Sequence, residues 1–388
     1  MPSASANPPA LARGATVTPP HFFADLYSFH WSKSQFRLPL VSAGAVALCL
    51  FAGVLAGHPG AGLVAGGGAF TVGFGPNQRI CDSRLTPMLA AVLGVAVATL
   101  VGTLAGHHGI SLLIAAGALA CVCGELTARH TGIAWVMQQS SVALLVASAF
   151  PTGPRLALIR AGLLAAGGIV QVIFTSAGLS LFRNLRRDAL AIPASIYRTV
   201  GERQRELARR LRRLPKSLPA LSRVKALRYA ARLGFTVLIA TEIYRRIGVQ
   251  SGYWIPMTAL LVQKPAFYET LSRAAARAGG TLAGSILCSL LLAHTSPRPE
   301  VLALITALFA LGAYAANPVN YALFSVCITG YIVFLLSLNQ IPGPLIAERR
   351  AWCTALGALI AVIIHLDALR RHRAGTRVPR RGPAAQTA

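Results

Sequence analysis

The stretch SGYWIPMTALLVQKPAFYETLSRAAARAGGTLAG, from Ser251 to Gly284, places an aromatic pair, a proline and a series of cations between two apolar segments. Such an alternation is typical of two membrane spans joined by a short charged turn, because backbone that leaves the hydrocarbon needs polar surroundings. The stretch therefore predicts a helical membrane protein. Lys264, Arg273 and Arg277 are expected in the inner turn and at the start of the helix that follows it.

The ends of the same stretch carry two further signals. Tyr253 and Trp254 are expected at the outer membrane interface, where amphipathic rings lie at the level of the lipid headgroups. Gly280 and Gly284 lie four positions apart and predict a face of small residues for close helix packing.

The composition of the whole chain agrees with a membrane protein. Of 388 residues, 54% are hydrophobic and only 12% are charged, whereas a soluble protein has about 25% charged residues. The net charge of +26 arises from 37 Lys and Arg against 11 Asp and Glu. In so apolar a chain this excess indicates cytoplasmic loops and contact with the lipid bilayer, and not nucleic-acid binding.

Apolar runs recur along the chain and are separated by short breaks with turn-forming or charged residues. The first half contains runs near 38–57, 60–76, 86–106, 109–128, 132–150 and 156–182. The second half contains runs near 231–248, 252–263, 275–294, 300–316, 319–338 and 350–367. The expected fold is thus an all-α polytopic membrane protein of about 12 transmembrane helices, arranged as two parallel-repeat six-helix modules.

Five segments follow from this pattern. They are a disordered cytoplasmic tail over 1–37, the first module over 38–182, a basic cytoplasmic linker over 183–230, the second module over 231–368, and a basic cytoplasmic tail over 369–388. Within the linker, 199–214 has the charge spacing of an amphipathic helix. The distribution of Lys and Arg favours both termini in the cytoplasm and an even number of spans.

Specific residues of the second half resemble the FUSC family, the fusaric acid resistance and aromatic acid exporter group of integral membrane transporters. The resemblance is carried by residues at the opening, the turn and the helix that follows: Tyr253, Trp254, Pro256, Thr258, Lys264, Pro265, Arg273, Arg277, Gly280, Thr281 and Gly284. The segments NYALFSVCITGYIVFLL and RRAWCTALGALIA, with Arg350 and Gly357, are similar to later spans of the family.

The resemblance implies a bacterial inner-membrane transporter that exports small organic acids, aromatic carboxylic acids among them, with the proton or electrochemical gradient as its driving force. A periplasmic adaptor protein and further copies of the chain are candidate partners. The long exporters of the family carry a large cytoplasmic domain, and this chain has only the basic linker in its place. Two alternatives remain open: a passive organic-anion channel of the plant malate-channel type, and a membrane scaffold that transports nothing.

A pathway for anions needs cations that acidic residues do not neutralise. The candidates are the three cations of the inner turn and two pairs at the outer mouth, Arg245–Arg246 and Arg349–Arg350. Arg is suited to carboxylates because its planar fork binds both oxygens. Gln138 and Gln139 form a polar patch within the fifth span, either lining a cavity or bonding between helices.

Proton coupling needs an ionisable group within the membrane. Glu125 and Glu242 are the candidates, although Arg129 and Arg245 follow at helical spacing and could pair with them. The chain has no nucleophile elbow, no phosphate-binding loop and no zinc motif. Neither enzyme activity, nor a cofactor, nor a metal site is expected.

Overall fold

The structure, a computed structural model, describes residues 23–33, 36–80, 83–178, 220–249, 251–293, 297–339 and 341–375. Over these residues the regular elements are helices, and the expectation of an all-α protein is confirmed. The first half contains α2 (Arg37–Leu55), α3 (Pro59–Val72), α4 (Leu85–Ala105), α5 (Gly109–Thr127), α6 (Thr131–Ser148) and α7 (Pro154–Gly178). The second half contains α9 (Ala220–Ile247), α10 (Trp254–Val262), α11 (Phe267–Ala293), α12 (Pro299–Ala316), α13 (Tyr321–Ser337) and α14 (Gly343–Gly375).

Several helices begin at a proline, which is the local reason for their boundaries. Pro59, Pro154 and Pro299 each occupy the first position of a helix, where the missing N–H would have no partner within the helix. A short 3-10 turn, η2 (Gly75–Asn77), follows α3 and contains Pro76. α7 and α12 are rich in Ala and Leu, which favour the helical conformation.

Seven of the described helices are long and apolar enough to cross a membrane: α2, α4, α5, α7, α11, α12 and α14. The second helix of each half is shorter. α3 has 14 residues and α10 has 9, and at about 1.5 Å per residue neither extends across a hydrocarbon core of about 30 Å. The structure supports a multi-pass membrane protein, but it does not confirm twelve full crossings.

Three helices of the second half begin earlier than the sequence pattern indicated. α9 begins at Ala220, α11 at Phe267 and α14 at Gly343, so Arg273 and Arg349 lie within helices and not in loops. The prediction equated a charge with a break in the span. A helix keeps charged residues where their side chains face the protein interior, because the backbone there is still satisfied by helical hydrogen bonds.

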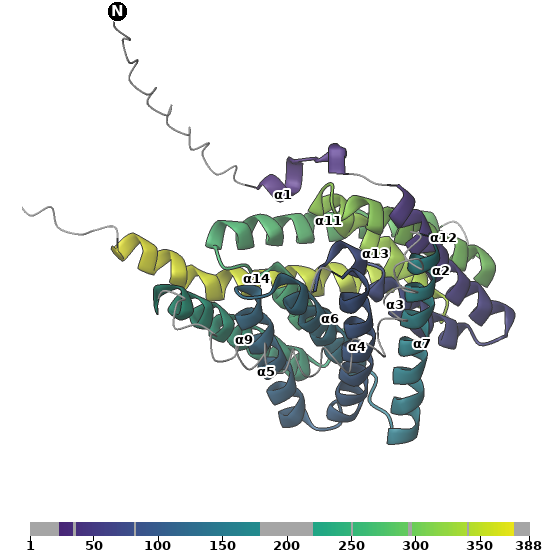
Figure 1. The fold of residues 1–388 in the computed structure, drawn as a ribbon, viewed down its shortest axis with the longest axis horizontal. Helices are drawn as coiled ribbons and strands as arrows, with labels where there is room; N and C mark the ends of the chain where they lie inside the picture. Colours follow the sequence, from purple (N-terminus) through teal and green to yellow (C-terminus); the bar gives the residue numbers. More distant parts are fainter. Residues whose placement is uncertain are drawn as a thin grey trace, which may run out of the picture.

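The helices of the first half pack in a pattern that recurs in the second half. In the first half α3 contacts α2 and α7, and α4 contacts α6 and α7. In the second half α10 contacts α9 and α14, and α11 contacts α13 and α14. The halves meet through α5 against α9 and α12 against α2. Figure 1 shows α4, α5 and α7 upright, whereas α11 and α14 run along the long axis of the view.

Glycines allow the close approaches within this pattern. A Cβ atom at Gly102 would overlap the backbone of Leu144, and one at Gly280 would overlap the backbone of Ala322. Four residues further on, Gly106 and Gly284 face Ser148 and Val326 in the same way. Residues 102–106 and residues 280–284 have the same sequence, Gly-Thr-Leu-Ala-Gly. The α4–α6 and α11–α13 contacts therefore both depend on two glycines four residues apart.

The connections between helices gather at two ends of the bundle. One end, here called the linker end, holds the α5–α6 and α10–α11 connections, and α9 reaches it through hydrogen bonds from Tyr229 Oη to Gln263 O (3.1 Å) and from Arg232 to Pro265 O (3.0 Å). At the opposite end, the rings of Phe150 and Tyr253 lie 6.3 Å apart.

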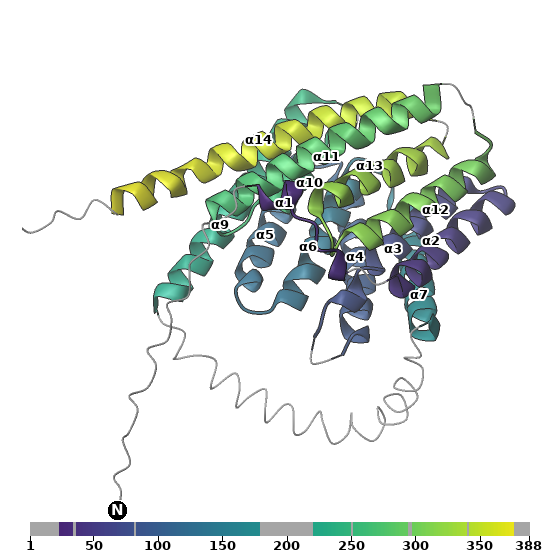
Figure 2. The same cartoon turned by 90° about the horizontal axis from the view of Figure 1, so that it is seen from above.

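An N-terminal segment, α1 (Ala24–Tyr27) and η1 (Trp31–Lys33), lies across α11 and α13 (Figures 1 and 2). Its backbone is held by Ser272, Val319 and Asn320, with the Ser28 carbonyl 3.0 Å from Asn320 Nδ2. The disordered tail expected over 1–37 therefore does not include residues 23–33, and α14 extends into the tail expected over 369–388. The remainder of each tail, before residue 23 and after residue 375, and the amphipathic helix expected over 199–214 lie outside the described residues.

Candidate anion-binding site

Two arginine side chains lie fully inside the second half of the protein. Arg277 on α11 is 1% exposed and Arg350 on α14 is 0% exposed. A guanidinium group stays protonated in proteins, so both positions hold a buried positive charge. Burying an unpaired charge costs several kcal/mol, which demands a compensating partner.

The partners that Arg277 and Arg350 would need are missing from the described residues. No nitrogen of the Arg277 guanidinium has a hydrogen-bond acceptor there, and neither has Nη1 or Nη2 of Arg350. Arg350 donates from Nε to Thr329 Oγ1 over 3.2 Å. Its charge lies within electrostatic range of Arg277, and no carboxylate is among the groups that act on it. The two arginines thus form a cationic pair without an anion.

The groups around this pair are donors or hydroxyls. The Trp254 ring packs on the Arg350 guanidinium, with the carbon Cζ 4.1 Å from the ring centre, and its indole N–H is buried without an acceptor. The hydroxyls of Thr258, Thr281 and Thr354 are also buried and have no partner in the described part of the chain. Buried guanidinium, indole and hydroxyl groups that can all donate hydrogen bonds are an environment for a negatively charged group.

A cavity of about 850 Å³ adjoins the pair and lies between the two halves. Arg277 and Trp254 line it, and Arg350 lies behind the Trp254 ring. The lining extends from Lys264 near the linker end to Phe150 and Gly60 at the opposite end. A cavity of this size holds a small organic molecule.

Lys264 and Arg273 add positive charge where the cavity nears the linker end. The Arg273 guanidinium carbon lies 3.9 Å from the centre of the Tyr321 ring, and both residues line the cavity. Lys264 lies in the loop between α10 and α11. Burial, and then the charge of Arg273, lower the pKa of its ammonium group to about 8, while the nearby Asp25 of the N-terminal segment opposes this shift.

The structure corrects the expected position of the aromatic pair. Tyr253 is 2% exposed and Trp254 is 4% exposed, so neither lies at the lipid headgroups as predicted. Both line the cavity. An aromatic pair beside a proline is equally suited to a lipid interface and to a buried cation, and only the packing of α14 against α10 distinguishes the two environments.

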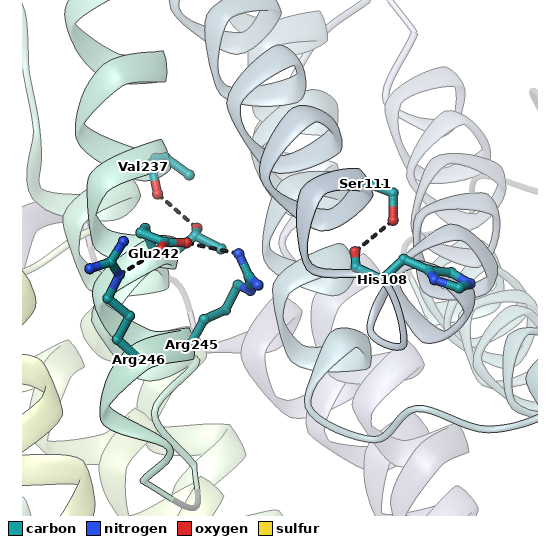
Figure 3. Close-up of polar contacts among 7 residues, drawn as sticks. His108, Ser111, Val237, Glu242, Arg245 and Arg246 are labelled. Atoms are coloured by element: carbon teal, nitrogen blue, oxygen red, sulfur yellow. Dashed lines mark hydrogen bonds and ion pairs between the residues drawn. The ribbon is translucent and has the colours of Figure 1, made fainter.

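The outer arginines divide into two groups. Arg245 and Arg246 are exposed and pair with Glu242 over 2.8 and 2.7 Å, within a single helix (Figure 3). They lie away from the cavity lining. Arg349 is partly exposed, whereas its neighbour Arg350 is buried. The structure therefore brings Arg350 to the other cations and leaves Arg245 and Arg246 at the periphery.

The two acidic candidates for coupling are both paired at the ends of helices. Glu125 accepts a hydrogen bond from Arg129 over 2.7 Å, and 45% of its side chain is exposed. Glu242 accepts hydrogen bonds from both of its arginine partners, Arg245 and Arg246. The neighbouring helix end is the N-terminus of α5, where the His108 carbonyl accepts a hydrogen bond from the Ser111 hydroxyl (Figure 3). Neither carboxylate lines the cavity.

The remaining predicted residues fall into lining and packing positions. Gln138 and Gln139 on α6 line the cavity. Thr258 lies against α14, where a Cβ atom at Gly357 would overlap the Ile255 carbonyl oxygen. Gly357 thus lets α14 approach α10, which holds Arg350 against Trp254.

Sequence reasoning missed one buried titratable group. His365 on α14 is fully buried, with Nδ1 2.9 Å from Thr270 Oγ1 and Nε2 without a partner among the described residues. A histidine within an apolar run was a signal that could have found it. Over the described residues, no group of three or more His, Cys, Asp or Glu is placed to hold a metal ion.

These features define a class: a helical, multi-pass membrane protein with a cationic cavity between its halves. Residues 238–364 match the family described as "Fusaric acid resistance protein-like". This part of the chain is similar to the FUSC family, as its residues indicated, and the match contains α10, α11, Arg277 and Arg350.

One further relative is a protein of Escherichia coli (strain K12) described as "Uncharacterized protein YhfK". It is 32% identical over 160 residues, which make up 40% of this chain and 23% of the relative. The chain therefore spans under a quarter of that protein in the match. No solved structure matches the chain.

Proposed function

We propose that this protein is a membrane transporter that exports small organic anions, with aromatic carboxylic acids as its main substrates. The observation that carries the proposal is the pair of buried arginines, Arg277 and Arg350, which have no anion among the described residues and adjoin a cavity between the halves. A carboxylate entering the cavity would accept hydrogen bonds from Arg277 and offset its charge.

The lining supports an aromatic substrate. Tyr253, Trp254, Phe70, Phe74 and Phe324 all border the cavity. Aromatic faces pack well against a ring, and a charge-assisted bond to arginine fixes the acidic end. The volume of about 850 Å³ leaves space for a single-ring acid with some of its water.

The proposed arrangement in the membrane has two six-helix modules with the linker end in the cytoplasm of a bacterium. In each module the short second helix, α3 or α10, extends only part of the way and borders the cavity. Short or interrupted helices at corresponding positions of two repeats mark the substrate site in many transporters. Lys264 and Arg273 would then receive anions from the cytoplasm.

The energy source is proposed to be the proton or electrochemical gradient, and no enzyme activity is proposed. Glu125 and Glu242 remain the candidates for coupling, although both form ion pairs outside the cavity. A passive channel is the alternative, and there both acids would be structural. Loss of concentrative export in the Glu125→Gln/Glu242→Gln double variant would support the carrier, and unchanged gradient-dependent flux would exclude a role for both acids. A periplasmic adaptor and homo-oligomers remain predictions.

The test uses the full chain in proteoliposomes with labelled benzoate and 4-hydroxybenzoate inside. We expect saturable, gradient-dependent release from vesicles with the native protein, and at least about tenfold slower release with Arg277→Gln, since a charge-assisted bond contributes about 1.5–3 kcal/mol. Arg298→Gln is the matched control, because Arg298 is exposed in the connection before α12. Release equal to that from protein-free vesicles would refute the proposal.

A further inference from the structure

The two halves contribute to the cavity from matching positions. A Cβ atom at Gly167 on α7 would overlap the Ala65 carbonyl oxygen on α3, and one at Gly357 on α14 would overlap the Ile255 carbonyl oxygen on α10. Ala65 and Ile255 are separated in sequence by the same number of positions as Gly167 and Gly357. The α3–α7 and α10–α14 contacts are therefore in the same register.

The sequences around these contacts agree with this register. Residues 153–161 read GPRLALIRA and residues 343–351 read GPLIAERRA, so Arg160 on α7 occupies the position of Arg350 on α14. By the same spacing, Val64 on α3 corresponds to Trp254 and Phe74 to Lys264, and all four border the cavity.

The α4–α6 and α11–α13 contacts have a register of their own. Gly102 faces Leu144 and Gly280 faces Ala322, again with one common spacing. In that register Thr99 on α4 corresponds to Arg277 on α11, and both border the cavity. Thr99 is buried and its hydroxyl has no partner among the described residues.

The matching positions carry different chemistry. Where the second half has Lys264, Trp254 and Arg277, the first half has Phe74, Val64 and Thr99. Arg160, the counterpart of Arg350, is partly exposed and donates to the Phe150 carbonyl over 2.5 Å. Among the described residues, Arg277 has no acceptor and Arg350 has only the Thr329 hydroxyl.

We infer that the halves are structural repeats of which only the second binds an anion, and that the cavity holds one ligand with its acidic group toward α10 and α11 and its apolar body toward α3. The ligand class is a small organic anion with an acidic group at one end and an apolar body at the other. Phe70 on α3 and Phe74, between α3 and η2, form the apolar wall, and the guanidinium of Arg277 binds the acidic group. This inference rests on the proposed function.

Electrostatics is the physical reason why the cavity should bind one anion and not two. The second half lines the cavity with Arg277, Lys264 and Arg273, which attract a carboxylate. An anion at the first half would instead meet Thr99, a phenyl ring and Arg160, whose guanidinium already donates to the Phe150 carbonyl. Two anions in one low-dielectric cavity would also repel each other. The first half then acts as the wall that orients the ligand.

The test is calorimetric titration of the purified full chain with benzoate, using paired variants of the two halves. We expect one benzoate per chain, binding weakened at least about tenfold by Arg277→Gln, and a change of less than about threefold for the counterpart Thr99→Val. Arg350→Gln should likewise weaken binding far more than Arg160→Gln. The circular-dichroism helix signal of each variant shows that it is folded.

Two benzoates per chain, or equal losses for the two members of a pair, would overturn the asymmetry while leaving an anion transporter in place. Absence of benzoate binding to the native chain would overturn the proposed function and the inference together. The double variant Thr99→Arg/Arg277→Gln gives a second measure that does not depend on loss of binding. Recovery of at least part of the affinity in this variant would support the assigned correspondence of the two positions, and no recovery in a folded protein would overturn it.

Discussion

Replacing Arg277 by methionine should separate binding from stability. The side chain is 1% exposed and its guanidinium has no acceptor among the described residues, so the native state carries an uncompensated desolvation penalty when no ligand is bound. Methionine has a similar length, fills irregular space and carries no charge. Exchange of buried ionic groups for apolar ones of similar volume is often neutral or stabilising by about 1–4 kcal/mol.

The same substitution should weaken ligand binding. Loss of charge-assisted hydrogen bonds to a carboxylate removes about 1.5–3 kcal/mol, which corresponds to roughly 10- to 150-fold weaker binding. The expected signature is therefore an unfolding temperature that is unchanged or raised in the absence of ligand, together with a large loss of benzoate affinity.

The assay is thermal unfolding in detergent, followed with and without benzoate, since a ligand that binds only the native state raises the unfolding temperature. The native protein should show a benzoate-dependent rise, and Arg277→Met should show almost none. A marked fall in unfolding temperature for Arg277→Met without ligand, with the benzoate response retained, would refute the reasoning. That outcome would mean that Arg277 is a structural residue whose charge is already compensated.

Three further outcomes follow from the structure. Gly357→Ala should lower the unfolding temperature, because the added Cβ atom would overlap the Ile255 carbonyl oxygen and overpacking costs about 1–3 kcal/mol. The control, Gly162→Ala, has open space at its Cβ position and should be neutral or stabilising. Equal effects of the two substitutions would contradict the close α10–α14 contact. Benzoate transport should fall as the pH rises through about 8, because the ammonium group of Lys264, with its lowered pKa, is charged below that pH and neutral above it. The Lys264→Arg variant should lose this pH dependence. An unchanged pH profile in that variant would exclude Lys264 as the source of the dependence. Glu125→Gln should change the unfolding free energy by less than about 1 kcal/mol, because the pair with Arg129 is solvent-exposed, and a denaturant titration showing a larger loss would contradict its placement at the surface.

The class of the protein was predictable from the sequence because hydropathy depends on local composition. Each expected apolar run corresponds to a described helix, even at the short α3 and α10. The boundaries of α11 and α14 were less predictable. Arg273 and Arg349 look like loop residues in a linear pattern, and only the packing shows that their helices start before them.

The candidate site was predictable in part. Lys264, Arg273, Arg277 and the two glutamines of α6 were expected along a pathway, and the structure places them at the cavity. Arg350 was expected at a mouth and is buried behind Trp254, because α14 approaches α10 at Gly357. His365 was overlooked, since a single histidine in an apolar run has no partner visible in sequence.

The sequence by itself determined that this chain is helical, suited to lipid and rich in cations, because these properties are sums over residues that need no neighbours. The tertiary structure decided which cations are buried, which are paired with carboxylates and which face the cavity. Arg245 and Arg350 are the same residue type in similar apolar runs, yet one pairs with Glu242 at the surface and the other has no acidic partner among the described residues. The electrostatic energy of a charge depends on the dielectric environment and on distances to groups far away in sequence, and only the packed helices determine those.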